Sequence, residues 1–134
     1  MRPPHVRAAV VAIAGTELAP DEDDLLRRQP PAGVILFGRN CRDRTQLRTL
    51  TDALRATQPG RRLPVLIDQE GGRVMRLKPP EWRGLPSAGA VGALASRGDL
   101  PAAREAAWML GRLMTVCVLR AAGLTDRRRV RDAT

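Results

Sequence analysis

The chain has 134 residues, 43% of them hydrophobic, and its net charge is +9. This length suits one domain or part of one, and the hydrophobic share is enough for a packed core, so we expect a soluble globular fold. Lys78 is the only lysine among 23 basic residues. Such use of arginine, beside abundant Ala and Gly, also follows from a GC-rich coding bias, so the charge favours a solvated surface over a nucleic-acid interface.

The sequence indicates neither a metal-binding cysteine motif nor a membrane span. Cys41 and Cys117 lack the spacing of a zinc site and are predicted to be reduced thiols. No run of about 18 apolar residues is present, which predicts no membrane-spanning segment. The apolar residues 6–14 are interrupted by Arg7 and followed by acids rather than a cleavage site, so we expect a cytoplasmic protein.

Apolar runs and helical patterns alternate in the first half of the chain. Residues 6–14 are partly β-branched and stopped by Gly15, which predicts a buried strand. Residues 21–28 place acids before bases, as the helix dipole favours, and predict a short helix. Residues 33–38 are apolar and bounded by glycines, which predicts a second strand.

A longer helix and a third strand come next. Asp43 is a capping residue, and leucines at spacings of three and four predict a helix to about residue 57 with one apolar face. Residues 65–67 predict a third buried strand. Alternating strands and helices give a parallel sheet with helices packed outside it, so the predicted fold class is α/β.

The remainder of the chain is less regular. Residues 78–87 are rich in Pro and Gly and predict a long loop, of a length that is usually functional. Residues 101–122 carry the longest helical pattern, and Trp108 on this helix is predicted to belong to the core. Residues 124–134 lack the apolar run that the alternation requires for a fourth strand.

Polar residues gather where the predicted strands stop. Asp68 and Glu70 follow the third strand, and Arg39 and Asn40 occupy the same place after the second. Ligands bind at the carboxyl ends of parallel strands, so Asp68 is the first candidate for a functional residue. Its alternative role is a loop cap or an ion pair with Arg73.

Two stretches resemble a known family. Gly-Val-Ile-Leu-Phe-Gly-Arg-Asn at 33–40 and Ile-Asp-Gln-Glu-Gly-Gly-Arg-Val-Met-Arg-Leu at 67–77 closely resemble the amino-terminal part of the bacterial β-N-acetylhexosaminidases of glycoside hydrolase family 3. The helix at 105–123 is also similar to one in that family. The resemblance covers roughly residues 6–125. Residues 1–125 are therefore predicted to be the N-terminal portion of that family's barrel domain, and residues 126–134 form a basic tail that does not match.

The resemblance implies a partial (β/α)8 TIM-type barrel, of which this chain would form the first three β/α units in truncated form. It implies hydrolysis of terminal, non-reducing β-linked N-acetylglucosamine from cell-wall muropeptides during peptidoglycan recycling. The reaction would proceed with retention, through an aspartate nucleophile and a histidine acid/base, without a cofactor. Asp68 would hold hydroxyls of the terminal sugar and Arg76 would also contact this carbohydrate substrate.

The chemistry of these residue types agrees with the implied roles. A carboxylate accepts two sugar hydroxyls at once, and charge-assisted hydrogen bonds are about twice as strong as neutral ones. Arg76 offers a rigid fork of donors, and Gly71-Gly72 allows a tight turn beneath the sugar. Asp68 and Glu70 face one side of a strand, but the resembled family takes its catalytic groups from later segments, so Glu70 is predicted to be structural.

Several family segments have no counterpart in the sequence. A full barrel needs about 250 residues, and neither the Lys-His-Phe-Pro-Gly-His-Gly segment nor the nucleophilic Ser-Asp-Asp segment is found. His5 is the only histidine and precedes the first strand, so no catalytic residue is assigned. We therefore expect a truncated or frameshifted enzyme that is inactive and unstable alone, because its strands would be left uncovered.

Two other readings stay open. The chain could be a non-catalytic sugar-binding remnant that retains Asp68 and Arg76. A basic nucleic-acid-binding module, using arginines between 120 and 131, ranks third because only three aromatic residues, Phe37, Trp82 and Trp108, could stack on bases. We therefore expect no nucleic-acid partner.

Overall fold

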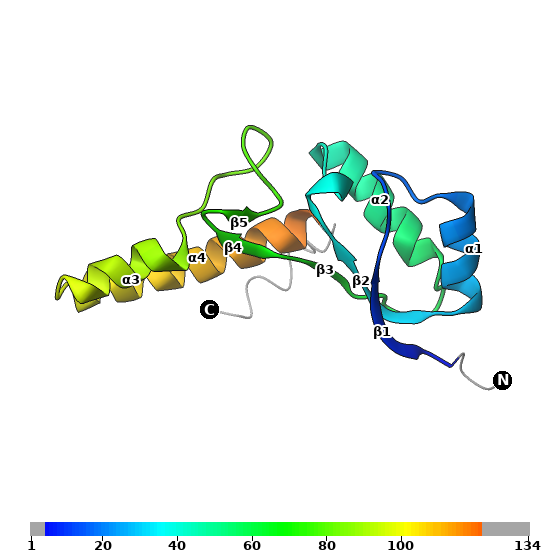
Figure 1. Ribbon diagram of the computed structural model, residues 1–134, viewed down its shortest axis with the longest axis horizontal. Coiled ribbons are helices and arrows are strands. Elements are labelled where there is room, and N and C mark those ends of the chain that lie inside the picture. Colours follow the sequence, from blue (N-terminus) through cyan, green and yellow to red (C-terminus); the bar gives the residue numbers. More distant parts are fainter. Residues whose placement is uncertain (1–4, 122–134) are drawn as a thin grey trace. The chain divides into compact units, whose positions relative to one another are not determined.

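The computed structural model describes residues 5–121, with side chains through residue 112. It divides into two compact units, one ending at Ile67 and the other beginning at Asp68. Each unit has its own sheet and its own helices (Figure 1).

The first unit is built on a parallel sheet. Its strands are β1 (Arg7–Ala12), β2 (Pro31–Leu36) and β3 (Val65–Ile67), in the order β1-β2-β3. Both pairings are parallel, and Val34 in the middle strand is aligned with Val11 on one side and Val65 on the other. The α/β class with a parallel sheet is therefore confirmed.

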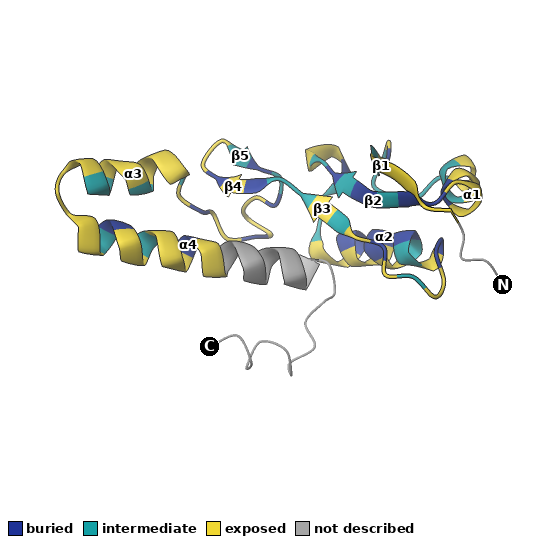
Figure 2. Ribbon diagram, turned by 90° about the horizontal axis from the view of Figure 1, so that it is seen from below, coloured by how far each residue is buried: buried dark blue, intermediate teal, exposed yellow. Residues whose placement is uncertain are grey.

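Helices connect these strands, as the alternating pattern predicts. Helix α1 (Pro20–Arg28) and the short 3-10 helix η1 (Gly38–Asn40) precede helix α2 (Arg44–Ala56). Asp43 caps α2, because its side chain accepts a hydrogen bond of 2.8 Å from the Gln46 amide. The predicted leucine face of α2 is buried against the sheet (Figure 2): Leu47, Leu50 and Leu54.

The outer strands are less buried than predicted. Only β2 is largely buried, whereas most of β1 is exposed and β3 is exposed at its centre. Val10 is 51% exposed and Leu66 is 43% exposed. The prediction of buried strands is wrong for β1 and β3, because both are edge strands of this sheet and have a neighbour on one side only.

The second unit combines a β-hairpin with a pair of helices. Strands β4 (Gln69–Gly71) and β5 (Val74–Met75) are antiparallel. Helices α3 (Ala88–Ser96) and α4 (Leu100–Ala121) lie side by side (Figure 2). A small apolar core joins the hairpin, the following loop and α4 through Met75, Leu85 and Leu110, with Val91 packed against it.

The α3 helix was not expected from the sequence. Its residues are mostly Ala and Gly, none of them is buried, and the apolar pattern on which helix prediction depends is missing. Ser87 begins this helix by accepting a hydrogen bond of 3.2 Å from the Ala90 amide. The predictions of an irregular segment at 78–87 and of the long helix α4 are confirmed.

Some predictions concern parts of the chain outside the described residues. They include the domain boundary near residue 125, the basic tail at 126–134, most of the arginines between 120 and 131, and the side chains of Arg120 and Cys117. Within residues 5–121, no helix combines the length and the apolar character needed to cross a membrane.

Candidate functional site

The candidate residues flank the β4–β5 hairpin. Asp68 follows Ile67, the last residue of β3, and directly precedes β4. Arg76 comes directly after β5. Since the two strands of a hairpin run in opposite directions, the residue before the first strand and the residue after the second lie at the same open end. The hairpin thus brings together two side chains that are eight positions apart in the sequence.

The turn of this hairpin depends on two glycines. Gly71 and Gly72 have φ angles of +84° and +60°, a region that side chains with a Cβ rarely adopt. A Cβ on Gly71 would lie 1.9 Å from the Pro86 carbonyl oxygen, and one on Gly72 would lie 2.6 Å from the Ser87 Cβ. The predicted tight turn is confirmed, and the group that approaches it so closely is the chain at residues 85–87.

Asp68 pairs with Arg76 rather than with Arg73. Arg76 Nη2 lies 3.6 Å from Asp68 Oδ2, a contact too long to be a hydrogen bond. The Asp68 side chain is 44% exposed and that of Arg76 is 30% exposed. The predicted alternative, an ion pair between Asp68 and Arg73, is therefore wrong in its partner. A contact as long as this one leaves the carboxylate oxygens accessible to a ligand.

Arg76 has an unused donor. Its Nε is buried without a hydrogen-bond partner in the described part of the chain. An unsatisfied buried donor costs about 1–3 kcal/mol, and such groups are rare in native proteins. Within the described residues, the guanidinium therefore keeps one unsatisfied donor beside an accessible carboxylate.

The structural role of Gln69, between Asp68 and Glu70, was not predicted from the sequence. Gln69 is only 4% exposed, and its side-chain amide bonds the backbone of Arg76 and Leu77. Side chains alternate between the two faces of a strand, so a polar residue between two accessible carboxylates was a signal that one polar group turns inward. Glu70 itself is exposed.

Arg39 and Asn40, the polar pair after β2, hold backbone segments of the first unit together. Asn40 is fully buried; its Oδ1 accepts a bond of 2.8 Å from the Phe37 amide, and its Nδ2 donates to the carbonyls of Ile13 and Gly15 at 3.1 and 2.7 Å. Arg39 also donates to the Ile13 carbonyl. Both side chains thus tie the end of β2 to the chain that follows β1.

Neither Cys41 nor His5 has the environment of a catalytic group. Burial raises the pKa of the Cys41 thiol to about 11, so this cysteine is protonated at neutral pH and is not an activated nucleophile. Cys41 is free, as predicted. His5 is exposed ahead of β1. A search of the described residues finds no group of three or more His, Cys, Asp or Glu side chains that could hold a metal ion.

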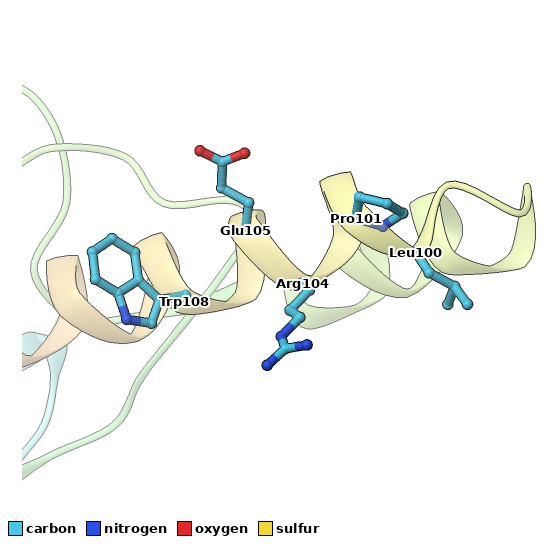
Figure 3. A pocket seen from close by; sticks show the side chains of 5 residues that line it. All are labelled: Leu100, Pro101, Arg104, Glu105 and Trp108. Carbon is cyan, nitrogen blue, oxygen red and sulfur yellow. The ribbon is translucent and has the colours of Figure 1, made fainter.

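A shallow hollow of about 590 Å³ lies elsewhere, along α4. Its lining residues are Leu100, Pro101, Arg104, Glu105 and Trp108. Figure 3 shows Arg104 and Glu105 pointing to opposite sides of the helix, so the polar groups do not converge. Trp108 is 60% exposed, with the Arg112 guanidinium 4.8 Å from its ring centroid, so its predicted core position is wrong. The reason is that Trp108 lies on an uncovered face of α4, whereas Leu110 meets the core.

Known proteins resemble this chain in sequence and in structure. Residues 7–120 match the model of the glycosyl hydrolase family 3 N-terminal domain. The Beta-hexosaminidase of Bordetella pertussis is 42% identical over 113 residues, covering 81% of this chain and 31% of the relative. That of Xanthomonas campestris pv. campestris is 41% identical over 103 residues, covering 75% and 31%. The chain thus spans about a third of the length of these curated relatives.

Solved structures give the same assignment. NagZ from Neisseria gonorrhoeae in complex with N-trifluoroacetyl-D-glucosamine superposes with a TM-score of 0.79 at 30% identity, over 89% of this chain and 36% of that protein. A glycoside hydrolase family 3 β-N-acetylglucosaminidase from Paenibacillus sp. gives a TM-score of 0.66 at 31% identity, over 89% and 21%. Because the family model matches most of its length, this chain belongs to glycosyl hydrolase family 3, a family of glycosidases, through that family's N-terminal domain.

Proposed function

We propose that this chain supplies the part of a β-N-acetylhexosaminidase site that holds the terminal N-acetylglucosamine, with Asp68 and Arg76 as substrate-binding residues. The observation that carries the proposal is the accessible Asp68 carboxylate, which lies beside an arginine whose Nε is unpaired. Among the described residues, neither group is held by a short side-chain hydrogen bond, so we take both as free to bind a ligand.

The chemistry of the pair suits a pyranose. The Asp68 carboxylate can accept hydrogen bonds from two neighbouring hydroxyls, and the Arg76 guanidinium can donate to a hydroxyl or ring oxygen from a fixed plane. Their separation of 3.6 Å leaves the lone pairs of the carboxylate free of a short hydrogen bond to Arg76. Two such charged groups fix the orientation of a sugar more strictly than neutral groups would.

The relatives support this class of substrate. The gonococcal NagZ was solved with a glucosamine derivative, and the curated relatives are named Beta-hexosaminidase. For the whole enzyme we propose retaining hydrolysis of terminal β-linked N-acetylglucosamine from cell-wall muropeptides, in a (β/α)8 barrel that includes the strands β1, β2 and β3. Retention requires a nucleophile and an acid/base group beside the glycosidic bond. Where both are carboxyl groups, they lie about 5 Å apart. We assign neither to this chain, and a cytoplasmic location stays a prediction.

Calorimetric titration of the 134-residue chain with N-acetylglucosamine tests the binding role. Asp68→Asn and Arg76→Met are expected to raise the Kd about tenfold or more, because a hydrogen bond to a charged group contributes about 1.5–3 kcal/mol. Glu70→Gln and Arg73→Met are matched controls, since both residues are exposed on the same hairpin and should leave the Kd unchanged. Equal losses in the controls and the site variants would refute the assignment.

A chimaera separates an enzyme segment from a non-catalytic sugar-binding remnant. Residues 7–120 of this chain would replace the matching segment of the Bordetella pertussis Beta-hexosaminidase. We expect the chimaera to hydrolyse a chromogenic N-acetylglucosaminide and Asp68→Asn to abolish that activity, whereas the 134-residue chain alone should not hydrolyse it. A folded but inactive chimaera that still binds the sugar would favour the remnant.

A further inference from the structure

The buried side chain of Gln69 hydrogen-bonds the backbone at the open end of the hairpin. The Gln69 Oε1 accepts hydrogen bonds of 3.0 Å from the backbone amides of both Arg76 and Leu77, and its Nε2 donates one of 3.0 Å to the Leu77 carbonyl. Gln69 is 4% exposed and Leu77 is fully buried. The two bonds to Leu77 are therefore buried and the bond from Arg76 is partly buried, and both ends of the amide are used.

These bonds extend the hairpin where its backbone pairing ends. In the β4–β5 ladder, Gln69 is aligned with Met75 and Gly71 with Val74, with an irregularity between the two pairs. The strand β5 stops at Met75, so Arg76 lies beyond the ladder. The Gln69 side chain supplies the partners that another strand residue would have supplied, and it thereby fixes the backbone from which the Arg76 side chain projects.

Within the described residues, the Arg76 guanidinium has few polar restraints of its own. Its Nε is buried and unpaired within the described residues, and its contact with Asp68 is 3.6 Å long. A long side chain with such loose contacts depends on its backbone for its position. Because Asp68 is the neighbour of Gln69 in the chain, one amide sets the spacing between the two substrate-binding groups.

We infer that Gln69 is the positioning residue of the Asp68–Arg76 pair, acting through the backbone of Arg76 and Leu77. The inference rests on the proposed function, since it concerns the same sugar-binding pair. A role in filling space alone would be met by any side chain of the same length. A positioning role instead requires the amide oxygen and nitrogen, and this difference can be tested.

The principal variant is Gln69→Met, which keeps the length of the side chain and removes the three hydrogen bonds. Amide hydrogen exchange, measured without sugar, should accelerate at Arg76 and Leu77 and stay unchanged in α2 and α4. The Kd for N-acetylglucosamine should rise about tenfold, the lower end of the loss seen when groups that orient metal ligands are removed. Gln69→Glu keeps the acceptor for both amides but loses the donor to the Leu77 carbonyl, so it should recover only part of the affinity.

Two outcomes would overturn the inference while leaving the proposed function intact. The first is unchanged exchange at Arg76 and Leu77 in Gln69→Met. The second is faster exchange at both amides with an unchanged Kd. Failure of the wild-type chain to bind the sugar, with Arg76 and Leu77 protected, would instead refute the proposed function and the positioning role with it.

A variant that loses exchange protection throughout α4 would not have kept its fold. In that case Gln69→Asn replaces Gln69→Met, because its amide is one methylene shorter and cannot reach both Arg76 and Leu77. It should give the same pattern of faster exchange at these two residues and weaker binding, and wild-type values for both would refute the inference. Glu70→Gln, a change at the exposed neighbour, should match the wild type in both measurements.

Discussion

The segments that follow β2 and β3 start alike in sequence, but their polar residues have different roles. Both place polar side chains directly after an apolar strand. In residues 37–46, Asn40 is fully buried and both of its amide hydrogens are taken by carbonyls of the preceding loop. In residues 68–77, the side chain of Asp68 is 44% exposed and lies 3.6 Å from that of Arg76. The Asn40 amide is used in hydrogen bonds that stabilise the fold, whereas the Asp68 carboxylate is available to a ligand.

The comparison shows which property separates a structural polar residue from a ligand-binding one. Position at the end of a strand does not separate the two kinds of residue, because Asn40 and Asp68 both have it. Burial and hydrogen bonding within the fold do. Within residues 68–77 the same division recurs between Gln69, which is buried and bonded at both ends of its amide, and Asp68 beside it. Substitutions of the two kinds of residue should therefore differ in their effects on stability and on binding.

The largest expected effect comes from the hairpin turn. Gly71→Ala should destabilise the second unit by about 3 kcal/mol or more, because it adds a strained positive φ to a collision with the Pro86 carbonyl. Gly98→Ala is the matched control, since Gly98 has the same φ of +84° and no atom within 4 Å of the position that a Cβ would take. It should cost only about 1 kcal/mol. Urea unfolding measures both, and equal losses would show that the Pro86 contact is unimportant.

Asn40→Ala should be the next most damaging change. It leaves the Gly15 carbonyl and the Phe37 amide without their side-chain partner in a buried site, and we expect a loss of about 3 kcal/mol in the free energy of unfolding. Asp68→Asn should change that free energy by less than about 0.5 kcal/mol, as is usual for exposed ion pairs. If Asp68→Asn were as destabilising as Asn40→Ala, Asp68 would be structural and the comparison would fail.

Cys41 gives a chemical test of burial in the first segment. Burial raises the pKa of its thiol to about 11, and the thiol donates to the Phe37 carbonyl at 3.5 Å. Since the thiolate is the reactive form, alkylation by iodoacetamide at pH 8 should be much slower in the folded chain than in urea. Cys117→Ser isolates the signal of Cys41. Equal rates in the folded and unfolded chains would show that residues 37–46 are open to solvent.

The smallest effect concerns the cap of α2. The hydrogen bond from the Gln46 amide, followed by that from Arg42, lowers the pKa of Asp43 below its usual value. A lowered folded-state pKa adds stability above the unfolded-state value, and this stability is lost as the pH falls through the folded-state value. The stability advantage of the wild type over Asp43→Asn should therefore be present at pH 7 and vanish in acid. An advantage independent of pH would contradict this cause.

Local patterns allowed much of the first unit to be predicted. Asp43 and the leucines of α2 determine a capped amphipathic helix without help from the rest of the chain, and the structure confirms it. The degree of burial of β1 and β3 could not be predicted in the same way, because it depends on which neighbours cover an edge strand. An apolar sequence shows that a strand can be buried, but not that anything covers it.

The second unit was harder to predict because it depends on contacts between separated segments. The turn at Gly71 meets Pro86, and Gln69 reaches Leu77, fifteen and eight residues along the chain. The family motif drew attention to Asp68 and Arg76, but no pattern in the sequence gives the pairing of Asp68 with Arg76 in place of Arg73. Trp108 shows the opposite error, since an aromatic residue on a helical pattern was expected in the core and is exposed.

The most direct test of the account is a titration of the isotopically labelled chain with N-acetylglucosamine, followed by the chemical shifts of its backbone amides. We expect saturable shifts confined to residues 68–77, none in residues 38–46, and loss of the shifts in Asp68→Asn. Absence of saturable shifts in the wild type, or the same shifts in Asp68→Asn, would contradict the assignment of Asp68 and Arg76 to sugar binding.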